Sequence, residues 1–206
     1  MLTARRVTAT LAVAAAMFAP IACAAPIYFD ATLSGAAENP PVVSPGFGTA
    51  TVVLDPVAHT MRVIVSFSDL VGTTTAAHVH CCTAPPNNVG VATQTPSFAG
   101  FPLGVMAGSY DSTFDTTLAS TFSAAFLNNN GGTPAAAEAA LLAGLLAGNA
   151  YFNVHTSFRT GGEIRGFLVQ RVPEPSTVVL IGLGMLVLTW ALHRRGVPAR
   201  RRASAG

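Results

Sequence analysis

The chain has 206 residues, of which 50% are hydrophobic and only 10% are charged. This composition excludes a disordered protein, because disorder requires low hydrophobicity and high charge. It also excludes a nucleic-acid binder, since the chain contains no lysine and five of its eleven basic residues lie in the last thirteen positions, leaving no basic face for a phosphate backbone.

The formal net charge of +2 comes from the two ends of the chain. Residues 25–172 carry eight acidic side chains against four arginines, which leaves this part with a net charge of −4. Basic termini around a mildly acidic body indicate membrane targeting at both ends.

The N-terminus, residues 1–24, is predicted to be a signal peptide. Arg5 and Arg6 are followed by an apolar stretch at 7–21 and then by the small residues of Ala22-Cys23-Ala24. A charged start, an apolar middle and a small-residue exit are typical of a segment that signal peptidase removes. We expect cleavage after Ala24, because the apolar stretch is short for a permanent membrane span.

Residues 25–172 are predicted to form an all-β domain, a Greek-key-like β-sandwich or barrel. Alternation of apolar and polar residues, with Gly, Pro and Asn between the alternating segments, predicts strands at 27–33, 48–54, 60–68, 76–82, 108–114, 151–156 and 163–171. The segments 48–54 and 60–68 are separated by a turn at 55–59, so they are expected to pair as a β-hairpin with a longer loop.

One short helical insert is predicted at about 133–147. Thr133 is a suitable N-cap and Pro134 suits the first helical position, while leucines further along form an apolar stripe. Gly144 in the middle is expected to weaken the helix by about 1 kcal/mol relative to alanine. The preceding segment 85–102 contains many prolines and glycines, which predicts a long loop.

A second apolar run at 178–192 is predicted to be a single transmembrane helix. Its fifteen residues make a helix about 22 Å long, which is short but can span a membrane that thins around it. Trp190 lies at the expected interface, and the arginines that follow place this end in the cytoplasm.

Pro173-Glu174-Pro175, the apolar run and the arginine cluster follow one another in that order at the end of the chain. With this arrangement, residues 173–206 resemble the PEP-CTERM protein-sorting signal. It implies a protein exported into a Gram-negative envelope and handled by an exosortase-type membrane peptidase. The expected location is therefore the cell envelope, with anchoring in the inner membrane, transient or permanent, before transfer to the surface or the extracellular matrix.

Four short segments stand out in the body: LSGAAENPPV at 33–42, AHVH at 77–80, GNAYFNVHT at 148–156 and GGEIRG at 161–166. In this order and spacing they resemble the CHRD domain, the repeat first named from chordin. Together they cover about residues 27–170. The resemblance implies a β-rich extracellular module and carries no assigned enzymatic activity. The sequence departs from the family pattern after His80, where two cysteines follow.

Three histidines are candidate metal ligands. His78 and His80 are two residues apart on one predicted strand, so both imidazoles leave the same face. His155 ends another predicted strand, and the three rings can meet if the two strands are neighbours. Three neutral imidazoles suit copper or zinc, and Cys82 joins their face if its strand continues. Copper would make the site redox-active.

A structural role for the same residues is the alternative. In that case His78, His80 and His155 form hydrogen bonds in a polar network with Asn153, Glu163 and Arg165 that holds loops against the sheet, as buried polar groups commonly do. Glu163 and Arg165 are two residues apart on one strand and can pair with each other. All of these side chains are expected to converge at one end of the domain.

Cys81 and Cys82 are expected to be the only cysteines of the mature chain, because Cys23 leaves with the signal peptide. In an oxidising compartment they can form a vicinal disulfide. The alternatives are two thiolate ligands beside the histidines, an exposed reactive pair, or buried free thiols.

No enzyme motif is present in the sequence: G-x-S-x-G, the Walker loop and H-E-x-x-H are all missing. We therefore expect a non-enzymatic, exported module with a structural or interaction role in the extracellular matrix. The alternative function is a periplasmic or surface metal-binding protein. Expected partners are signal peptidase, the exosortase-type peptidase and the membrane, through 178–192.

Overall fold

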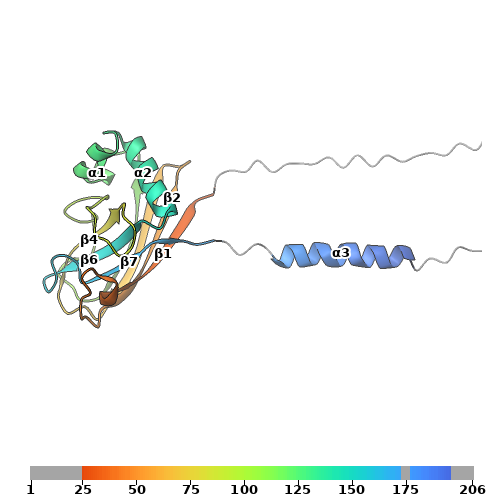
Figure 1. The fold of residues 1–206 in the computed structure, drawn as a ribbon, viewed down its shortest axis with the longest axis horizontal. Coiled ribbons are helices and arrows are strands. Elements are labelled where there is room, and N and C mark those ends of the chain that lie inside the picture. The colour runs from red at the N-terminus through yellow and green to blue at the C-terminus, as the bar shows by residue number, and fades with distance from the viewer. Residues whose placement is uncertain (1–24, 173–176, 196–206) are drawn as a thin grey trace, which may run out of the picture.

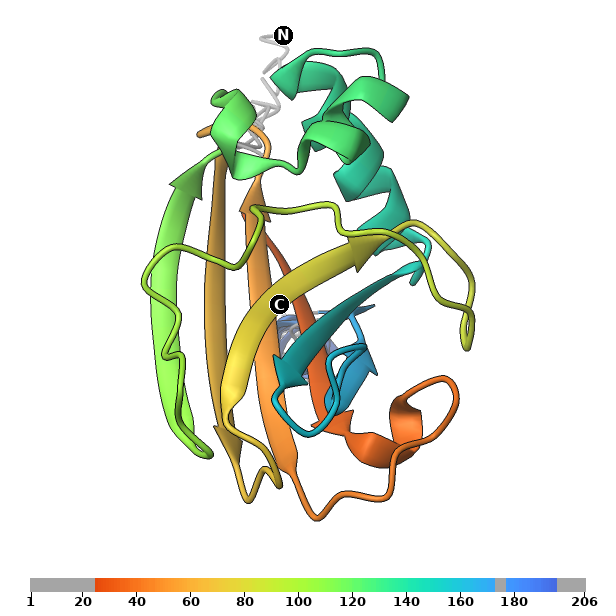
Figure 2. The ribbon, with the colours of Figure 1, turned by 90° about the vertical axis from the view of Figure 1, so that its left-hand side faces the viewer.

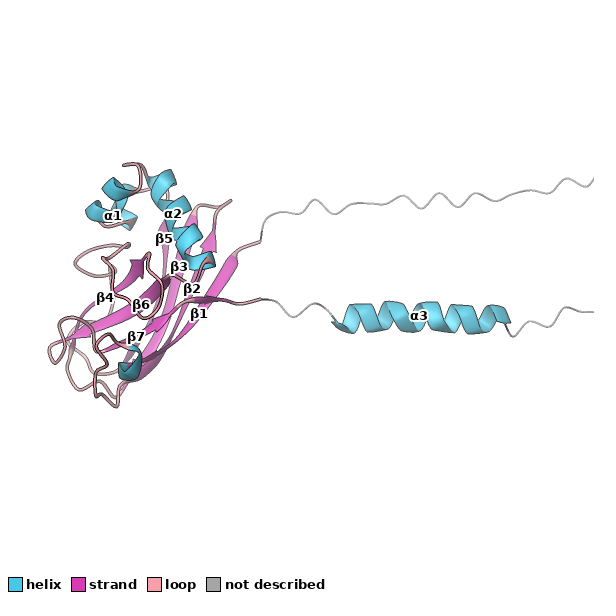
Figure 3. Ribbon diagram, in the orientation of Figure 1, coloured by secondary structure: helices cyan, strands magenta, loops and turns pink. Residues whose placement is uncertain are grey.

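The computed structural model describes residues 25–172 and 177–195 (Figure 1). The body consists of one eight-stranded sheet with two α-helices at one end, as Figure 3 shows by colour. The strands are β1 (Ile27–Ser34), β2 (Phe47–Asp55), β3 (Thr60–Ser68), β4 (Thr74–Cys81), β5 (Gly108–Asp115), β6 (Ala150–Thr156), β7 (Ile164–Phe167) and β8 (Val169–Gln170).

The strands form one sheet and not the two packed sheets of the predicted sandwich. The strands follow one another as β4-β6-β7-β1-β2-β3-β5, with β8 paired to β1, and all the pairs are antiparallel. The sheet curls so strongly that β4 and β6 lie across from β2 and β3 (Figure 2). Two halves of one sheet thus enclose the core that a sandwich would place between two sheets.

The predicted hairpin forms between β2 and β3, from Phe47 paired with Ser68 to Asp55 paired with Thr60. The carboxylate of Asp55 accepts hydrogen bonds from the backbone N–H groups of Val57 and Ala58, which closes the turn. His59 completes the turn with a positive φ of 52°. The segment 163–171 was expected as one strand, but it divides into β7 and β8 around Leu168, which is fully buried.

The core fills the concave side of the curled sheet. Alternate residues of β2 and β3 point into it, as do Phe152 and Val154 of β6. Burying such side chains contributes about 1.5–3 kcal/mol each, relative to leaving them exposed. The core therefore stabilises the curl that brings β4 and β6 over the rest of the sheet.

Two α-helices cover one end of the core. Helix α2 (Pro134–Leu146) lies within the predicted insert, and the side chain of Thr133 caps it by accepting from the N–H of Ala136. Helix α1 (Ala124–Asn129) was not predicted, although Ser123 caps it in the same way. Short 3-10 helices, also unpredicted, occur at η1 (Gly35–Ala37) and η2 (Ala119–Thr121).

Helix α3 (Thr177–Arg195) covers the predicted apolar run at 178–192. Across the described residues, no helix combines the length and the apolar character needed to cross a membrane. The predicted signal peptide, residues 1–24, and the Pro173-Glu174-Pro175 motif lie outside the described residues.

Candidate functional site

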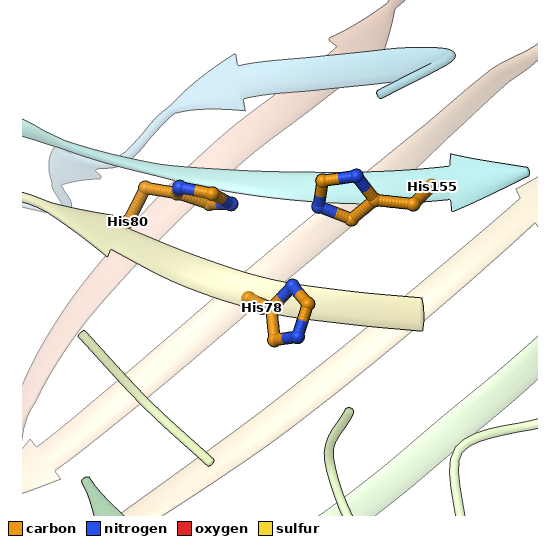
Figure 4. Close-up of side chains that lie close together, drawn as sticks. All are labelled: His78, His80 and His155. Carbon is orange, nitrogen blue, oxygen red and sulfur yellow. The ribbon is translucent and has the colours of Figure 1, made fainter. Parts of the chain in front are cut away.

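The three candidate histidines lie together on neighbouring strands (Figure 4). β4 carries His78 and His80, and β6, its antiparallel neighbour, carries His155. The register pairs His155 with Ala76, so all three rings leave the face of the sheet opposite to the core. Alternation along β4 explains this placement, because Ala77, Val79 and Cys81 point into the core.

The rings form a compact triangle. Ring centroids are 5.8 Å apart between His78 and His80, 5.1 Å between His78 and His155, and 5.7 Å between His80 and His155. Each residue offers one ligating nitrogen, and these three atoms lie within 4.8 Å of one another. The cluster is thus a candidate metal centre built entirely from imidazole.

Each imidazole makes one hydrogen bond to a backbone carbonyl of a covering loop. Nε2 of His78 lies 2.7 Å from the oxygen of Pro96, Nδ1 of His80 lies 2.8 Å from that of Val89, and Nδ1 of His155 lies 2.9 Å from that of Thr160. A carbonyl oxygen only accepts, so each of these nitrogens carries the proton. The bonds therefore assign the tautomer of all three rings.

The second nitrogen of each ring is left with a lone pair and no partner. Nδ1 of His78, Nε2 of His80 and Nε2 of His155 are buried and make no hydrogen bond. Buried polar atoms normally have a partner, and three orphaned acceptors in one cluster are unusual. A ring held by one nitrogen to a carbonyl and free at the other is the arrangement that metal-ligating histidines adopt.

The cluster is uncharged at neutral pH. Burial lowers the pKa of His78 to about 4, assisted by the nearby His155 and opposed by the bond to Pro96. Burial also lowers the pKa of His80 to about 4, and it lowers the pKa of His155. Neutral imidazole is the form that binds metal ions, so no proton has to be displaced before coordination.

Arg165 of β7 lies beside this cluster but bonds elsewhere. It is fully buried and donates to the carbonyl oxygens of Ala37 and Pro86 and to Oδ1 of Asn88. Its guanidinium lies 4.8 Å from the ring centroid of Tyr151. Arg165 therefore holds two loops against the sheet.

Asn153 lies between the histidines and Arg165, because it pairs with His78 on β4 and with Arg165 on β7. Its amide nitrogen donates to the carbonyl oxygen of Gly161 at 3.4 Å, while its buried Oδ1 has no hydrogen-bond partner. Asn153 thus contacts the turn that also receives the hydrogen bond of His155.

Glu163 forms its own set of bonds away from the histidines. Its carboxylate accepts from the hydroxyls of Ser44 and Thr156 and from the backbone N–H groups of Val71 and Gly72. Burial acts to raise its pKa, but these four hydrogen bonds more than offset burial and leave the pKa below its usual value. None of these bonds joins Glu163 to Arg165 or to a histidine.

The two cysteines are joined to each other in a disulfide. β4 ends at Cys81, so Cys82 is not on the strand that carries the histidines, and the three-histidine group does not include it. Cys82 instead faces α2, with its sulfur 3.7 Å from the carbonyl oxygen of Ala140. The disulfide leaves neither sulfur as a thiolate ligand.

Glu38 is a functional candidate that the sequence reasoning did not single out, although it lies in the segment 33–42. It is 6% exposed, and its Oε2 lies 3.7 Å from Nε of Arg165. Burial raises its pKa to about 7, against the opposing charge of Arg165.

The carbonyl partners of the histidines were also missed, because no sequence pattern reveals which backbone oxygen a folded loop presents.

Comparison with known proteins agrees with the two resemblances in the sequence. The family model described as the CHRD domain matches residues 29–168, and the model described as the PEP-CTERM protein-sorting motif matches residues 171–195. No curated protein and no solved structure gives a significant match. The matched motif supports export and sorting to the cell envelope or surface, with processing by an exosortase-type peptidase. The chain belongs to the CHRD-domain family and carries a PEP-CTERM sorting signal at its C-terminal end.

Proposed function

We propose that this exported CHRD protein binds one copper or zinc ion through His78, His80 and His155. The observation that supports the proposal is the set of three buried ring nitrogens, each without a hydrogen-bond partner, on rings that are neutral and held in one tautomer. These nitrogens have the donor chemistry that both metals accept.

The size of the cluster supports the same proposal. Metal–nitrogen bonds of about 2.0–2.1 Å separate the ligands of a tetrahedral ion by about 3.4 Å. The ligating nitrogens lie within 4.8 Å of one another, so small ring rotations suffice to close the site. Three protein ligands leave one coordination position for water or another small molecule.

A structural function is the second candidate, and a specific observation favours it. The three histidine–carbonyl bonds connect the sheet to the loops that contain Val89, Pro96 and Thr160. A module whose outer face is covered in this way suits a structural or interaction role in the extracellular matrix. Under this function the histidines hold the loops and need no metal.

Metal analysis of the full chain separates the two functions. The chain, purified from cells grown with copper and zinc, is expected to retain about one metal ion per molecule. Substitution His155→Ala is expected to abolish that content. His59→Asn is the matched control, because His59 lies in the β2–β3 turn, where its ring bonds to Glu138.

The opposite pattern would support the structural function. In that case the purified chain holds no stoichiometric metal, and His155→Ala costs about 1–3 kcal/mol of stability by leaving the Thr160 carbonyl without its donor. Metal content would then be the same for the wild type, His155→Ala and His59→Asn.

A further inference from the structure

A pocket lies on the other side of the turn that holds His155. Its volume is about 340 Å³, and it is lined by Glu38, Asn39, Val42, Phe158, Arg159 and Thr160, among others. This volume is within the range of small-molecule sites, which typically combine apolar walls with a few polar groups. The pocket is separate from the three-histidine cluster, and the inference drawn from it does not depend on the metal proposal.

The turn between the pocket and the histidines requires glycine at position 162. Gly162 has a φ of +126°, and a Cβ there would overlap the amide of Asn153 and Oε1 of Glu38. The absence of a side chain lets Glu38 approach the turn. Oε1 of Glu38 is buried and has no hydrogen-bond partner, so the wall of the pocket contains an unused polar group.

The charges around the pocket favour an anion. Arg159 is exposed, and its guanidinium stacks over the ring of Phe158, 4.9 Å from the centroid, which holds the cation at the rim. Arg165 lies behind the wall, 3.7 Å from Glu38. Because the buried Arg165 offsets the charge of Glu38, the exposed Arg159 leaves the rim of the pocket with a positive charge.

The remaining walls suit a ring with hydroxyl groups. Val42, Pro40 and Phe158 are apolar residues of the lining, while Asn39 and Thr160 are polar residues of it. An arginine fork binds a carboxylate through two parallel hydrogen bonds. A ligand that matches this lining has an apolar ring face, several hydroxyls and one carboxylate.

From this arrangement we infer that the pocket binds a hexuronate, a sugar ring that carries a carboxylate. Arg159 binds the carboxylate, the ring lies against Phe158 and Val42, and Thr160 and Asn39 meet the hydroxyls. Because the carbonyl oxygen of Thr160 accepts from Nδ1 of His155, occupation of the pocket also reaches the histidine cluster.

Calorimetric titration of the purified full chain with sodium glucuronate tests the inference, with glucose and sodium acetate as parallel probes. We expect glucuronate to bind with a dissociation constant on the order of 1 mM, as is usual for a single small ring. Glucose, which lacks the carboxylate, and acetate, which lacks the ring, should each bind at least fivefold more weakly. Equal binding of glucose or of acetate would overturn the assignment, as would no saturable binding of glucuronate.

Variants locate the binding. Arg159→Ala should weaken glucuronate binding at least tenfold, because it removes an exposed group that binds the carboxylate. Arg171→Ala is the matched control, since Arg171 is also an exposed arginine stacked on an aromatic ring, that of Tyr28, and it does not line the pocket. Equal affinity in the two variants would place the sugar elsewhere and overturn the inference.

A second measurement does not depend on substitution. Nitrogen chemical shifts of the imidazoles, recorded on the metal-free full chain, should change for His155 on addition of glucuronate and stay constant for His59. Unchanged His155 shifts at saturating glucuronate would contradict binding beside Thr160.

Discussion

His80 and Tyr151 stack face to face across β4 and β6, with ring centroids 4.7 Å apart and ring planes 5° apart. The hydroxyl of Tyr151 donates to the carbonyl oxygen of Val89, the same oxygen that Nδ1 of His80 approaches. Arg165 lies over the ring of Tyr151, so a buried cation, an aromatic ring and a candidate ligand form one stack. Tyr151 therefore positions His80 without being a ligand itself.

Tyr151→Ala is expected to weaken metal binding about 10- to 100-fold, the usual effect of removing a group that orients a ligand. Tyr151→Phe keeps the stack and loses only the hydroxyl, so its effect should be smaller. Competition with a chelator of known affinity measures both. If the two variants bind metal as tightly as the wild type, the stack has no role in holding His80 for an ion.

Acid should destabilise the metal-free protein through the histidines. The folded-state pKa values of His78 and His80 are about 4, below the unfolded value near 6.5, so unfolding takes up protons between these values. The contribution of these two histidines to the free energy of unfolding is complete above pH 6.5 and is lost as the pH falls towards 4. For each proton taken up on unfolding, the free energy of unfolding changes by about 1.4 kcal/mol per pH unit.

Glu38 acts in the opposite direction, because its folded-state pKa of about 7 exceeds the ordinary value of 4.5. Its contribution to stability is present at low pH and is lost as the pH rises from 4.5 through 7. Glu38→Gln removes this opposing contribution, so the free energy of unfolding should fall more steeply between pH 6.5 and 5 in the variant than in the wild type. Urea unfolding with a chelator present measures the change. A free energy of unfolding that does not change with pH in the wild type and in Glu38→Gln would contradict both assignments.

Gly144→Ala should destabilise the protein, although alanine favours a helix by about 1 kcal/mol. Gly144 is buried in α2, and a Cβ there would overlap the sulfur atoms of both Cys81 and Cys82. Overpacking of this kind costs about 1–3 kcal/mol. Thermal and urea unfolding measure the change.

The control for this prediction is the same substitution without the disulfide. In a Cys81→Ala/Cys82→Ala background, the overlap is relieved and Gly144→Ala should become neutral or stabilising. A similar loss of stability in both backgrounds would show that the disulfide does not determine the need for glycine.

Processing is expected at both ends of the chain. The predicted signal peptide at 1–24 leads us to expect a mature protein that begins near Ala25. The sorting motif matched at 171–195 leads us to expect that it ends between Pro173 and Ser176. Intact-mass analysis of the protein isolated from its native cells measures both ends. A native form that retains Trp190 throughout growth would instead indicate a permanent C-terminal anchor.

Local patterns in the sequence were sufficient for several features. The alternation at 60–68 predicted β3 with the observed bounds, and Thr133 and Pro134 predicted the start of α2. The ordered motifs predicted the CHRD and PEP-CTERM assignments, which the family models confirm. These signals are local, since they depend on side-chain direction along one strand, on one cap or on a short run of residues.

Other features depend on contacts between residues far apart in the chain. The sequence indicated that His78 and His80 share a face, but only the pairing of β4 with β6 brings His155 to them. Likewise, the two-residue spacing of Glu163 and Arg165 suggested a pair, yet each bonds to different loops. Antiparallel pairing and loop packing create these neighbours, and alternation along a single strand contains no information about which strand lies beside it.

Local sequence patterns were therefore enough to predict most of the strands, the capped helix, the sorting signal and the family. Three other features depend on long-range contacts: the strands form one curled sheet, three imidazoles each keep a free nitrogen, and Gly144 makes room for a disulfide. Every residue has a backbone carbonyl, so no sequence pattern marks the one that holds a histidine tautomer. The carbonyl of Thr160 has this role only because the fold places it beside Nδ1 of His155.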